Sequence, residues 1–243
     1  GSLSSDFLKV EHPLEAVNGD QYAITLTVND GIDNSKLNLG QDLFISDYCA
    51  HPDDTDAWSL EIYNPTDMDI SLSDYGIISE RSFEDDDWDD QSYSFPSGNL
   101  DSGDPAIIIA GETIVITYKT ATQGDAADYL DFNNINWDRW SQLKLTGNYA
   151  FALTKNDIII DAIGTVNFPG QGWETAGFGE ATKESQLTRK DTVVGGNADV
   201  DCLDGTNNNA CWNQSAGTSV EDSEWVYNED GGAVDICRDD CWN

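Results

Sequence analysis

Basic residues are scarce in this sequence. Its 243 residues include 11 Lys and Arg against 46 Asp and Glu, which gives a net charge of −35. A field of that sign repels DNA, RNA and anionic membranes, and it attracts cations. The sequence also lacks any uninterrupted hydrophobic run long enough to cross a bilayer. We therefore expect no nucleic-acid partner and no membrane insertion.

Catalytic motifs are missing as well. The two histidines, His12 and His51, do not accompany a nucleophile motif such as GxSxG. Among 46 carboxylates some must lie close together by chance. A close pair would therefore be weak evidence for a glycosidase active site. We expect no enzyme activity and no catalytic residues.

The five cysteines include no CxxC pair, which argues against a zinc site. Four of them stand in the last quarter of the chain: Cys202, Cys211, Cys237 and Cys241. We expect these four to form two disulfides, most simply Cys202 with Cys211 and Cys237 with Cys241, although crossed pairing is open. Cys49 is then left over, as a buried free thiol. Disulfides indicate a compartment outside the reducing cytosol, so we expect an extracellular or cell-surface protein.

Acidic residues gather in two segments that suit calcium. Calcium prefers six to eight oxygen ligands on a flexible loop, and the segment 199–207 offers spaced oxygens around a glycine. It has one residue too many for an EF-hand loop and lacks the terminal Glu. The segment 84–90 is denser, and such a run is more often a solvated surface. The candidate metal ligands are Asp199, Asp201, Asp204, Asn207, Asp85, Asp87 and Asp89. We expect structural calcium, with an acidic coat for salt tolerance as the alternative.

Aromatic residues are plentiful, with 8 Trp, 9 Tyr and 8 Phe, so the chain is not a disordered acidic tail. Trp88, Trp137 and Trp140 stand in surroundings rich in Asp and Asn. Exposed rings beside such acceptors suit a sugar-binding face, and we take these three as candidate ligand-binding residues. The alternative is that the loops use their tryptophans as a small core of their own, which we favour for Trp212 and Trp242.

Short alternating segments predict a β-sandwich. The expected strands are 21–29, 43–48, 58–63, 68–72, 75–78, 106–109, 113–118, 142–145, 150–153, 158–163, 185–189 and 224–226. Turn signals separate them, and only 121–130 has a weak helical pattern.

Seven motifs follow one another in a recognisable order. They are 43–48 (LFISDY), 60–66 (LEIYNPT), 70–76 (ISLSDYG), 110–116 (AGETIVI), 151–155 with 159–164 (FALTK, IIDAIG), 187–190 (LTRK) and 223–225 (SEW). In this order, from about residue 41 to residue 227, they resemble the bacterial type of lamin tail domain.

The resemblance implies an all-β, immunoglobulin-like β-sandwich over residues 41–230 without a catalytic centre. Residues 1–40 are then an N-terminal strand or extension, and 231–243 a cysteine-containing tail that disulfides pin to the domain. The chain departs from the pattern in an acidic insertion at 79–105, an aromatic one at 123–141 and a cysteine-containing one at 199–222.

These features predict a non-catalytic extracellular or cell-surface module for binding or structure, stabilised by calcium. Its ligand would be a glycan, a mineral surface or a protein of the same surface layer. The resemblance implies one alternative, because microbial lamin tail domains often occur beside hydrolases in secreted proteins. The chain would then be an accessory domain of a larger secreted hydrolase such as a nuclease or phosphatase. Another is a purely structural acidic domain adapted to high salt.

Overall fold

The computed structural model describes residues 26–27, 36–37, 42–50, 58–81, 91–118, 131, 134–166, 170–197 and 210–229. The chain divides into two compact units, Gly1–Gly40 and Gln41–Asn243. In the first unit β1 (Leu26–Thr27) pairs antiparallel with β2 (Lys36–Leu37). All other described elements belong to the second unit.

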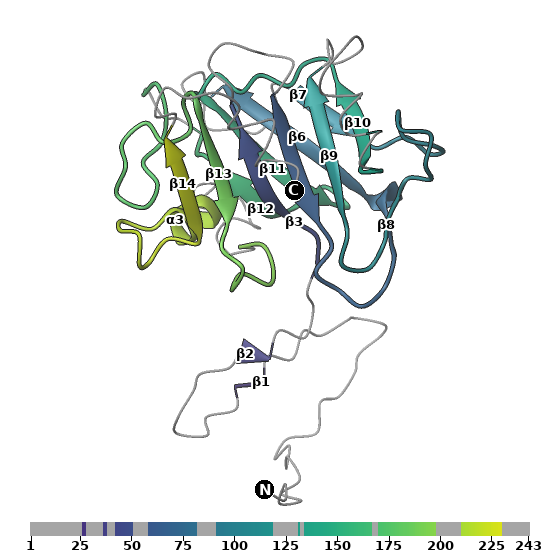
Figure 1. Ribbon diagram of the computed structural model, residues 1–243, viewed down its shortest axis with the longest axis horizontal. Coiled ribbons are helices and arrows are strands. Elements are labelled where there is room, and N and C mark those ends of the chain that lie inside the picture. Colours follow the sequence, from purple (N-terminus) through teal and green to yellow (C-terminus); the bar gives the residue numbers. More distant parts are fainter. Residues whose placement is uncertain are drawn as a thin grey trace, which may run out of the picture. The chain divides into compact units, whose positions relative to one another are not determined.

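The second unit contains a six-stranded sheet in the order β10-β9-β4-β3-β13-β14 (Figure 1). Its strands are β3 (Phe44–Cys49), β4 (Ser59–Tyr63), β9 (Thr113–Tyr118), β10 (Asn136–Trp140), β13 (Ser185–Arg189) and β14 (Trp225–Glu229). Neighbouring strands are antiparallel except β10, which runs parallel to β9 at one edge.

A four-stranded antiparallel sheet in the order β12-β11-β6-β7 forms the second layer. Its strands are β6 (Tyr75–Arg81), β7 (Gln91–Ser94), β11 (Tyr149–Lys155) and β12 (Ile158–Ile163). The smaller elements are the paired β5 (Ile70–Ser71) and β8 (Ile107–Ile108), the 3-10 turn η2 (Leu72–Asp74) and the helix α3 (Ala210–Ala216).

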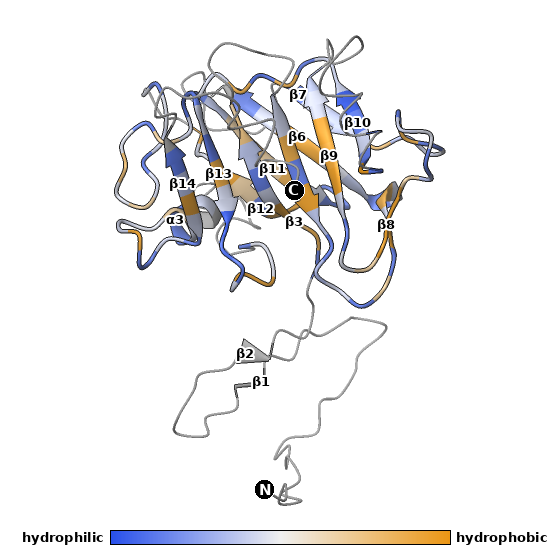
Figure 2. Cartoon of the chain, in the orientation of Figure 1, coloured by the Kyte–Doolittle hydropathy of each residue, from blue (hydrophilic) through white to orange (hydrophobic). Residues whose placement is uncertain are grey.

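Apolar side chains of the two sheets meet between the layers. Alternate strand residues point inward, so hydrophobic stretches run along the middle strands in Figure 2. The ring of Tyr48 on β3 lies 6.4 Å from that of Phe151 on β11, and the ring of Trp140 lies 6.1 Å from the same Phe151. Trp225 of β14 is fully buried in this core and contacts Trp212 of α3. Such burial is the main source of a sandwich's stability.

Close packing at the end of β12 requires a glycine. Gly164 has φ of +80°, and a Cβ there would lie 2.8 Å from the ring of Trp173. Trp173 is buried, and its indole Nε1 donates to Thr165 Oγ1 at 2.8 Å. The glycine thus lets a tryptophan from the following loop close the end of the core.

The predicted immunoglobulin-like β-sandwich is confirmed. The strands expected at 43–48, 58–63, 113–118, 150–153, 158–163, 185–189 and 224–226 are present as β3, β4, β9, β11, β12, β13 and β14. The strand expected at 75–78 is present as β6, whereas β5 and β8 account for parts of the ranges expected at 68–72 and 106–109. Of the range 21–29, only 26–27 is described, and the helix candidate at 121–130 lies outside the described residues.

The strand predicted at 142–145 is wrong. Leu143 and Leu145 are buried while Gln142 and Lys144 are exposed, so the alternation reflects real burial. These residues nevertheless pair with no described strand. β2, β7, β10 and α3 were not predicted from the sequence. Among the described residues, no helix is long and apolar enough to cross a membrane.

Candidate functional site

The outer face of the six-stranded sheet presents its side chains in three rows that cross the strands. The first row consists of Phe44, Tyr63 and Thr113. The second consists of Val226, Thr188, Asp47, Glu61, Val115 and Trp137, and the third of Asn228, Gln186, Cys49, Ser59, Thr117 and Arg139. Thirteen of these fifteen positions come from strands that the sequence pattern predicted, because only β10 was missed.

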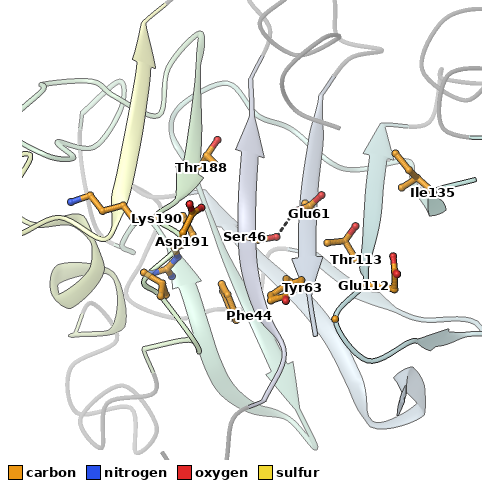
Figure 3. Close-up of a pocket in the computed structure, with 13 residues that line it drawn as sticks. Phe44, Ser46, Glu61, Tyr63, Glu112, Thr113, Ile135, Thr188, Lys190 and Asp191 are labelled. Carbon is orange, nitrogen blue, oxygen red and sulfur yellow. Dashed lines mark hydrogen bonds between the residues drawn. The ribbon is translucent and has the colours of Figure 1, made fainter. Parts of the chain in front are cut away.

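A groove with a volume of about 740 Å³ lies over the first row and part of the second (Figure 3). The ring of Phe44 packs edge-on against that of Tyr63, with 5.6 Å between centroids. Hydroxyl groups of Ser46, Thr113 and Thr188 line the same groove. An aromatic patch with convergent polar groups in a hollow of this size is typical of a small-ligand site.

A β-bulge brings the polar groups of the groove together. The register of β3 against β4 shifts between Ile45 and Asp47, so Ser46 is an extra residue opposite Glu61. The Ser46 hydroxyl donates to Glu61 Oε1 at 2.6 Å. Burial raises the pKa of Glu61, although hydrogen bonds from Ser46 and Thr113 partly oppose the shift. The bulge thus places a serine and a glutamate side by side at the groove.

Asp47 lies beside the groove and is almost completely buried. Its Oδ2 accepts from Thr188 Oγ1 at 2.6 Å and from Gln186 Nε2 at 3.1 Å. Burial raises the pKa of Asp47 well above its ordinary value, and the nearby Glu61 adds to the shift. The Oε1 atom of Gln186 is buried without a hydrogen-bond partner.

Arg189 closes one end of the groove and connects the two sheets. Its guanidinium binds both carboxylate oxygens of Asp161 on β12, at 2.8 and 3.1 Å, and also pairs with Glu224. The guanidinium carbon lies 4.1 Å from the ring centroid of Trp225. Asp161 in turn accepts from the backbone N–H of Ile45 at 2.9 Å. This group, named here the Arg189 cluster, fixes the groove wall against the core.

The groove carries little positive charge that a ligand could use. Arg189 is committed to its cluster, and Lys190 Nζ donates to the backbone oxygens of Val220 and Ser223. Glu112 and Asp191 add carboxylates to the lining. The groove therefore suits a neutral ligand better than an anionic one.

The expectation of an exposed tryptophan pair is corrected by the structure. Trp137 and Trp140 lie on β10, where only 5% and 4% of each residue is exposed. Three positions apart on a strand, they point to opposite faces, with Trp140 in the core. The indole Nε1 of Trp137 donates to Asp131 Oδ1 at 2.8 Å. Neither ring can stack on a ligand in this arrangement. Trp88 lies outside the described residues.

The predicted calcium ligands are not among the described residues. The segments with Asp199, Asp201, Asp204 and Asn207 and with Asp85, Asp87 and Asp89 both lie outside them. Within the part of the chain that the structure describes, no group of three or more His, Cys, Asp or Glu side chains could hold a metal ion.

Cys49 is not a free thiol, which corrects the expectation for this residue. It is fully buried on the outer face and takes part in a disulfide. The side chains of the other four cysteines lie outside the described residues. Because Cys49 uses one of them, those four cannot form two disulfides among themselves.

The family model of the lamin tail domain matches residues 38–167. This chain belongs to the lamin tail domain family. No curated protein matches it. Lamin tail domains are non-catalytic and immunoglobulin-like, in agreement with the two sheets. The match to the lamin tail domain ends before β13 and β14, yet these strands complete the sheet that carries the groove.

The groove of this lamin tail domain was missed by the sequence analysis. Glu61 did stand at an outward position of a predicted strand, which is a usable signal for a polar surface site. Its approach to Ser46 depends on the bulge, and its approach to Thr113 depends on the pairing of β4 with β9. Neither contact has a signature in the sequence.

Proposed function

We propose that this lamin tail domain is a non-catalytic binding module of a secreted or cell-surface protein, and that a neutral glycan binds in the groove on its outer sheet face. The observation that carries the proposal is the combination of the Tyr63 ring with hydroxyl and carboxylate groups in one hollow. Sugars present C–H faces that pack on aromatic rings and hydroxyls that exchange hydrogen bonds with such groups.

The charge of the molecule narrows the ligand class. At a net charge of −35, sulfated or uronic-acid glycans and nucleic acids would meet repulsion before any contact. Glu61 can accept hydrogen bonds from sugar hydroxyls, or donate one when protonated, whereas its pairing with Ser46 keeps it in place. A neutral oligosaccharide fits these conditions best.

Titration calorimetry with neutral oligosaccharides derived from cellulose, chitin and galactan tests the proposal. At least one should bind the intact chain, and Tyr63→Ala should weaken that binding at least tenfold, which corresponds to about 1.4 kcal/mol. Glu61→Gln should weaken it less, because the amide keeps one acceptor. A sulfated oligosaccharide of the same length should bind more weakly than the neutral one.

Phe178→Ala is the matched control. Phe178 is an exposed ring that stacks on Tyr227 and does not line the groove. Its loss should leave the affinity unchanged. The proposal is wrong if no neutral oligosaccharide binds, or if Tyr63→Ala binds as tightly as the native protein. The domain would then be left with a structural role.

The cellular location and the calcium belong to this proposal too. The secreted or surface location is supported by the disulfide at Cys49 and by the acidic composition. Calcium would bind at Asp199, Asp201, Asp204 and Asn207 and stabilise the domain without taking part in any reaction.

A further inference from the structure

Two acidic side chains stand opposite each other on the central strands of the outer face. Asp47 of β3 pairs with Glu61 of β4 in the register of the sheet. Side chains at such positions have Cβ atoms about 4.5–5.5 Å apart. Hydrogen bonds hold both acids in place, since Thr188 donates to Asp47 Oδ2 at 2.6 Å and Ser46 donates to Glu61 Oε1 at 2.6 Å. The sheet therefore fixes two carboxyl groups side by side.

Within the described part of the chain, no basic side chain forms an ion pair with either acid. The basic groups on the neighbouring strands have other partners: Arg189 is held in the Arg189 cluster, Lys190 donates to two backbone oxygens and Arg139 pairs with Asp101. The other charged groups that line the groove, Glu112 and Asp191, are acidic themselves. The charges around the pair thus oppose the ionisation of both acids.

Burial opposes it as well. Asp47 is only 4% exposed, and Glu61 is half-buried. Both hydrogen bonds that Asp47 accepts end on Oδ2, and no donor of the described residues reaches Oδ1. Burial, and to a smaller extent the charge of Glu61, raises the pKa of Asp47. Two interacting acids of this kind lose their protons in separate steps, so the pair keeps one proton at pH values where isolated carboxyl groups are ionised.

A ligand in the groove strengthens this effect. Glu61 lines the groove (Figure 3), so a neutral ligand placed over it displaces water that solvates its charge. A second negative charge on the pair is then less favourable in the complex than in the free protein. The protonated pair consequently binds the ligand more tightly than the doubly ionised pair, and binding takes up protons.

We propose that Asp47 and Glu61 hold one proton between them, and that the groove binds its neutral ligand most tightly in this protonated form. This pH dependence rests on the proposed function, because it concerns the ligand of the same groove. The pair takes its proton from solvent when the ligand binds and returns it when the ligand leaves. Acidic surroundings thus favour the complex, and a rise in pH releases the ligand.

Titration calorimetry at a series of pH values, with the neutral oligosaccharide that binds, tests the proposal on the intact chain. Between about pH 5 and pH 9 the Kd should rise with pH by up to about tenfold per unit, which is the limit for one proton. Titrations at one pH in two buffers of different ionisation enthalpy should show proton uptake on binding. A Kd that does not change with pH, or proton release on binding, contradicts the proposal.

Variants assign the effect to the pair. Asp47→Asn/Glu61→Gln removes both ionisations and keeps an acceptor at each position, so its Kd should not change with pH. Asp191→Asn is the matched control, because it removes an exposed carboxylate that also lines the groove. It should keep the pH dependence of the native protein. If the double variant keeps that dependence too, other groups cause it and the proposal is wrong.

An NMR titration of the side-chain carboxyl carbons in the free protein examines the proton without any ligand. The signals missing from Asp47→Asn and from Glu61→Gln identify the two groups. One group should keep its proton well above its ordinary pKa, in a step separate from the other. If both lose their protons at ordinary values, the pair holds no proton and the proposal is overturned.

The two measurements distinguish this failure from failure of the proposed function. If an oligosaccharide binds with a Kd that does not change with pH, the proposed function stands and only the proton-dependent binding is wrong. If no oligosaccharide binds, the proposed function and the proton-dependent binding fail together. The NMR titration then still decides whether Asp47 and Glu61 hold the proton.

Discussion

Arg189 shows how one residue can hold the two sheets in place. Its guanidinium forms two hydrogen bonds to Asp161 and stacks on Trp225, and all three side chains are buried. A buried ion pair of this kind gains little over an apolar pair, but loss of one partner leaves an uncompensated charge. Sequence and structure agree on its importance, since Arg189 and Trp225 belong to two of the motifs that resembled the family.

Replacing Arg189 should therefore strongly destabilise the folded protein. We expect Arg189→Met to lower the free energy of unfolding by about 3–5 kcal/mol, because the carboxylate of Asp161 stays buried without its partner. Urea denaturation followed by tryptophan fluorescence measures the loss. Arg139→Met is the control, since its pair with Asp101 is about one-third exposed and should contribute at most about 1 kcal/mol. Equal losses in the two variants would show that the Arg189 cluster contributes no more than a surface pair.

Asp47 should make the stability of the domain depend on pH. Its pKa in the folded state is raised by burial above the ordinary 3.8, so between the two values the unfolded chain binds fewer protons than the folded one. Stability from this group is therefore complete below pH 3.8 and is lost as pH rises through the folded pKa. Each unit of the shift corresponds to about 1.4 kcal/mol.

Asp47→Asn removes this ionisation and keeps an acceptor for Thr188 and Gln186. The stability of the variant relative to the native protein should be lowest near pH 3.5 and should rise as pH increases towards 7. Urea denaturation at a series of pH values gives this difference. Asp67→Asn, on an exposed residue, should show no such trend. A constant difference for Asp47→Asn would mean that burial of Asp47 does not govern the pH dependence.

At the scale of elements, the β11–β12 hairpin depends on two residues in the left-handed region. Asn156 and Asp157 have φ of 51° and 63°, as in a two-residue turn of type I′. Asn adopts the left-handed region readily. At Asp157 the Cβ atom makes this backbone conformation unfavourable, and glycine has no Cβ atom. The sequence predicted a turn here, between the strands expected at 150–153 and 158–163.

We expect Asp157→Gly to raise the free energy of unfolding by about 0.5 kcal/mol, because the relief of backbone strain exceeds the extra chain entropy of glycine. Thermal unfolding followed by circular dichroism measures the change. Asp67→Gly is the control: Asp67 is exposed with a negative φ, so glycine there should only destabilise. A destabilised Asp157→Gly variant would contradict the prediction.

The strands that sequence analysis predicted share one property. In β4, β9 and β11 large apolar core residues stand at alternate positions, namely Leu60 and Ile62, Ile114 and Ile116, and Phe151 and Leu153. β10 lacks this property, since its sequence NWDRW puts a tryptophan on each face. Asp138 points between the layers because Tyr93 of the other sheet donates a hydrogen bond to it. Long-range contacts of this kind determine that residues 136–140 form a strand, and no local sequence pattern indicates such contacts.

The same distinction applies to the candidate site. The residues that the sequence suggested were loop tryptophans and acidic clusters, which were chosen by composition. The groove is formed instead by outward residues of regular strands, and Ser46 and Glu61 meet only because of the bulge. Sequence patterns predicted the strands well, but they could not predict which outward side chains converge.

At the scale of the whole molecule, the net charge of −35 opposes the compact state. Any added salt should screen this repulsion and raise the melting temperature. Specific calcium binding would add to this general effect. The two contributions can be separated, because screening depends only on ionic strength and the charge of the ions.

We expect millimolar CaCl₂ to raise the melting temperature above that in MgCl₂ of equal ionic strength, by several degrees if calcium reaches about 100 times its Kd. Asp201→Asn/Asp204→Asn should abolish the difference between calcium and magnesium. The control variant Asp67→Asn/Asp104→Asn changes the net charge by the same amount at exposed positions. It should preserve the difference in melting temperature between calcium and magnesium. If the two salts act alike on the native protein, the acidic residues serve as a screened coat and not as a calcium site.

The disulfide at Cys49 also has a consequence for how the chain can be joined to others. Five is an odd number, so no pairing within one chain can satisfy every cysteine. Whatever the partner of Cys49, at least one of the five cysteines has no disulfide partner within this sequence. If a single sulfur is left, it can link the domain covalently to one neighbour and no more. Oxidation would then give pairs and not networks, and the same atom offers a unique point for attaching a spectroscopic label.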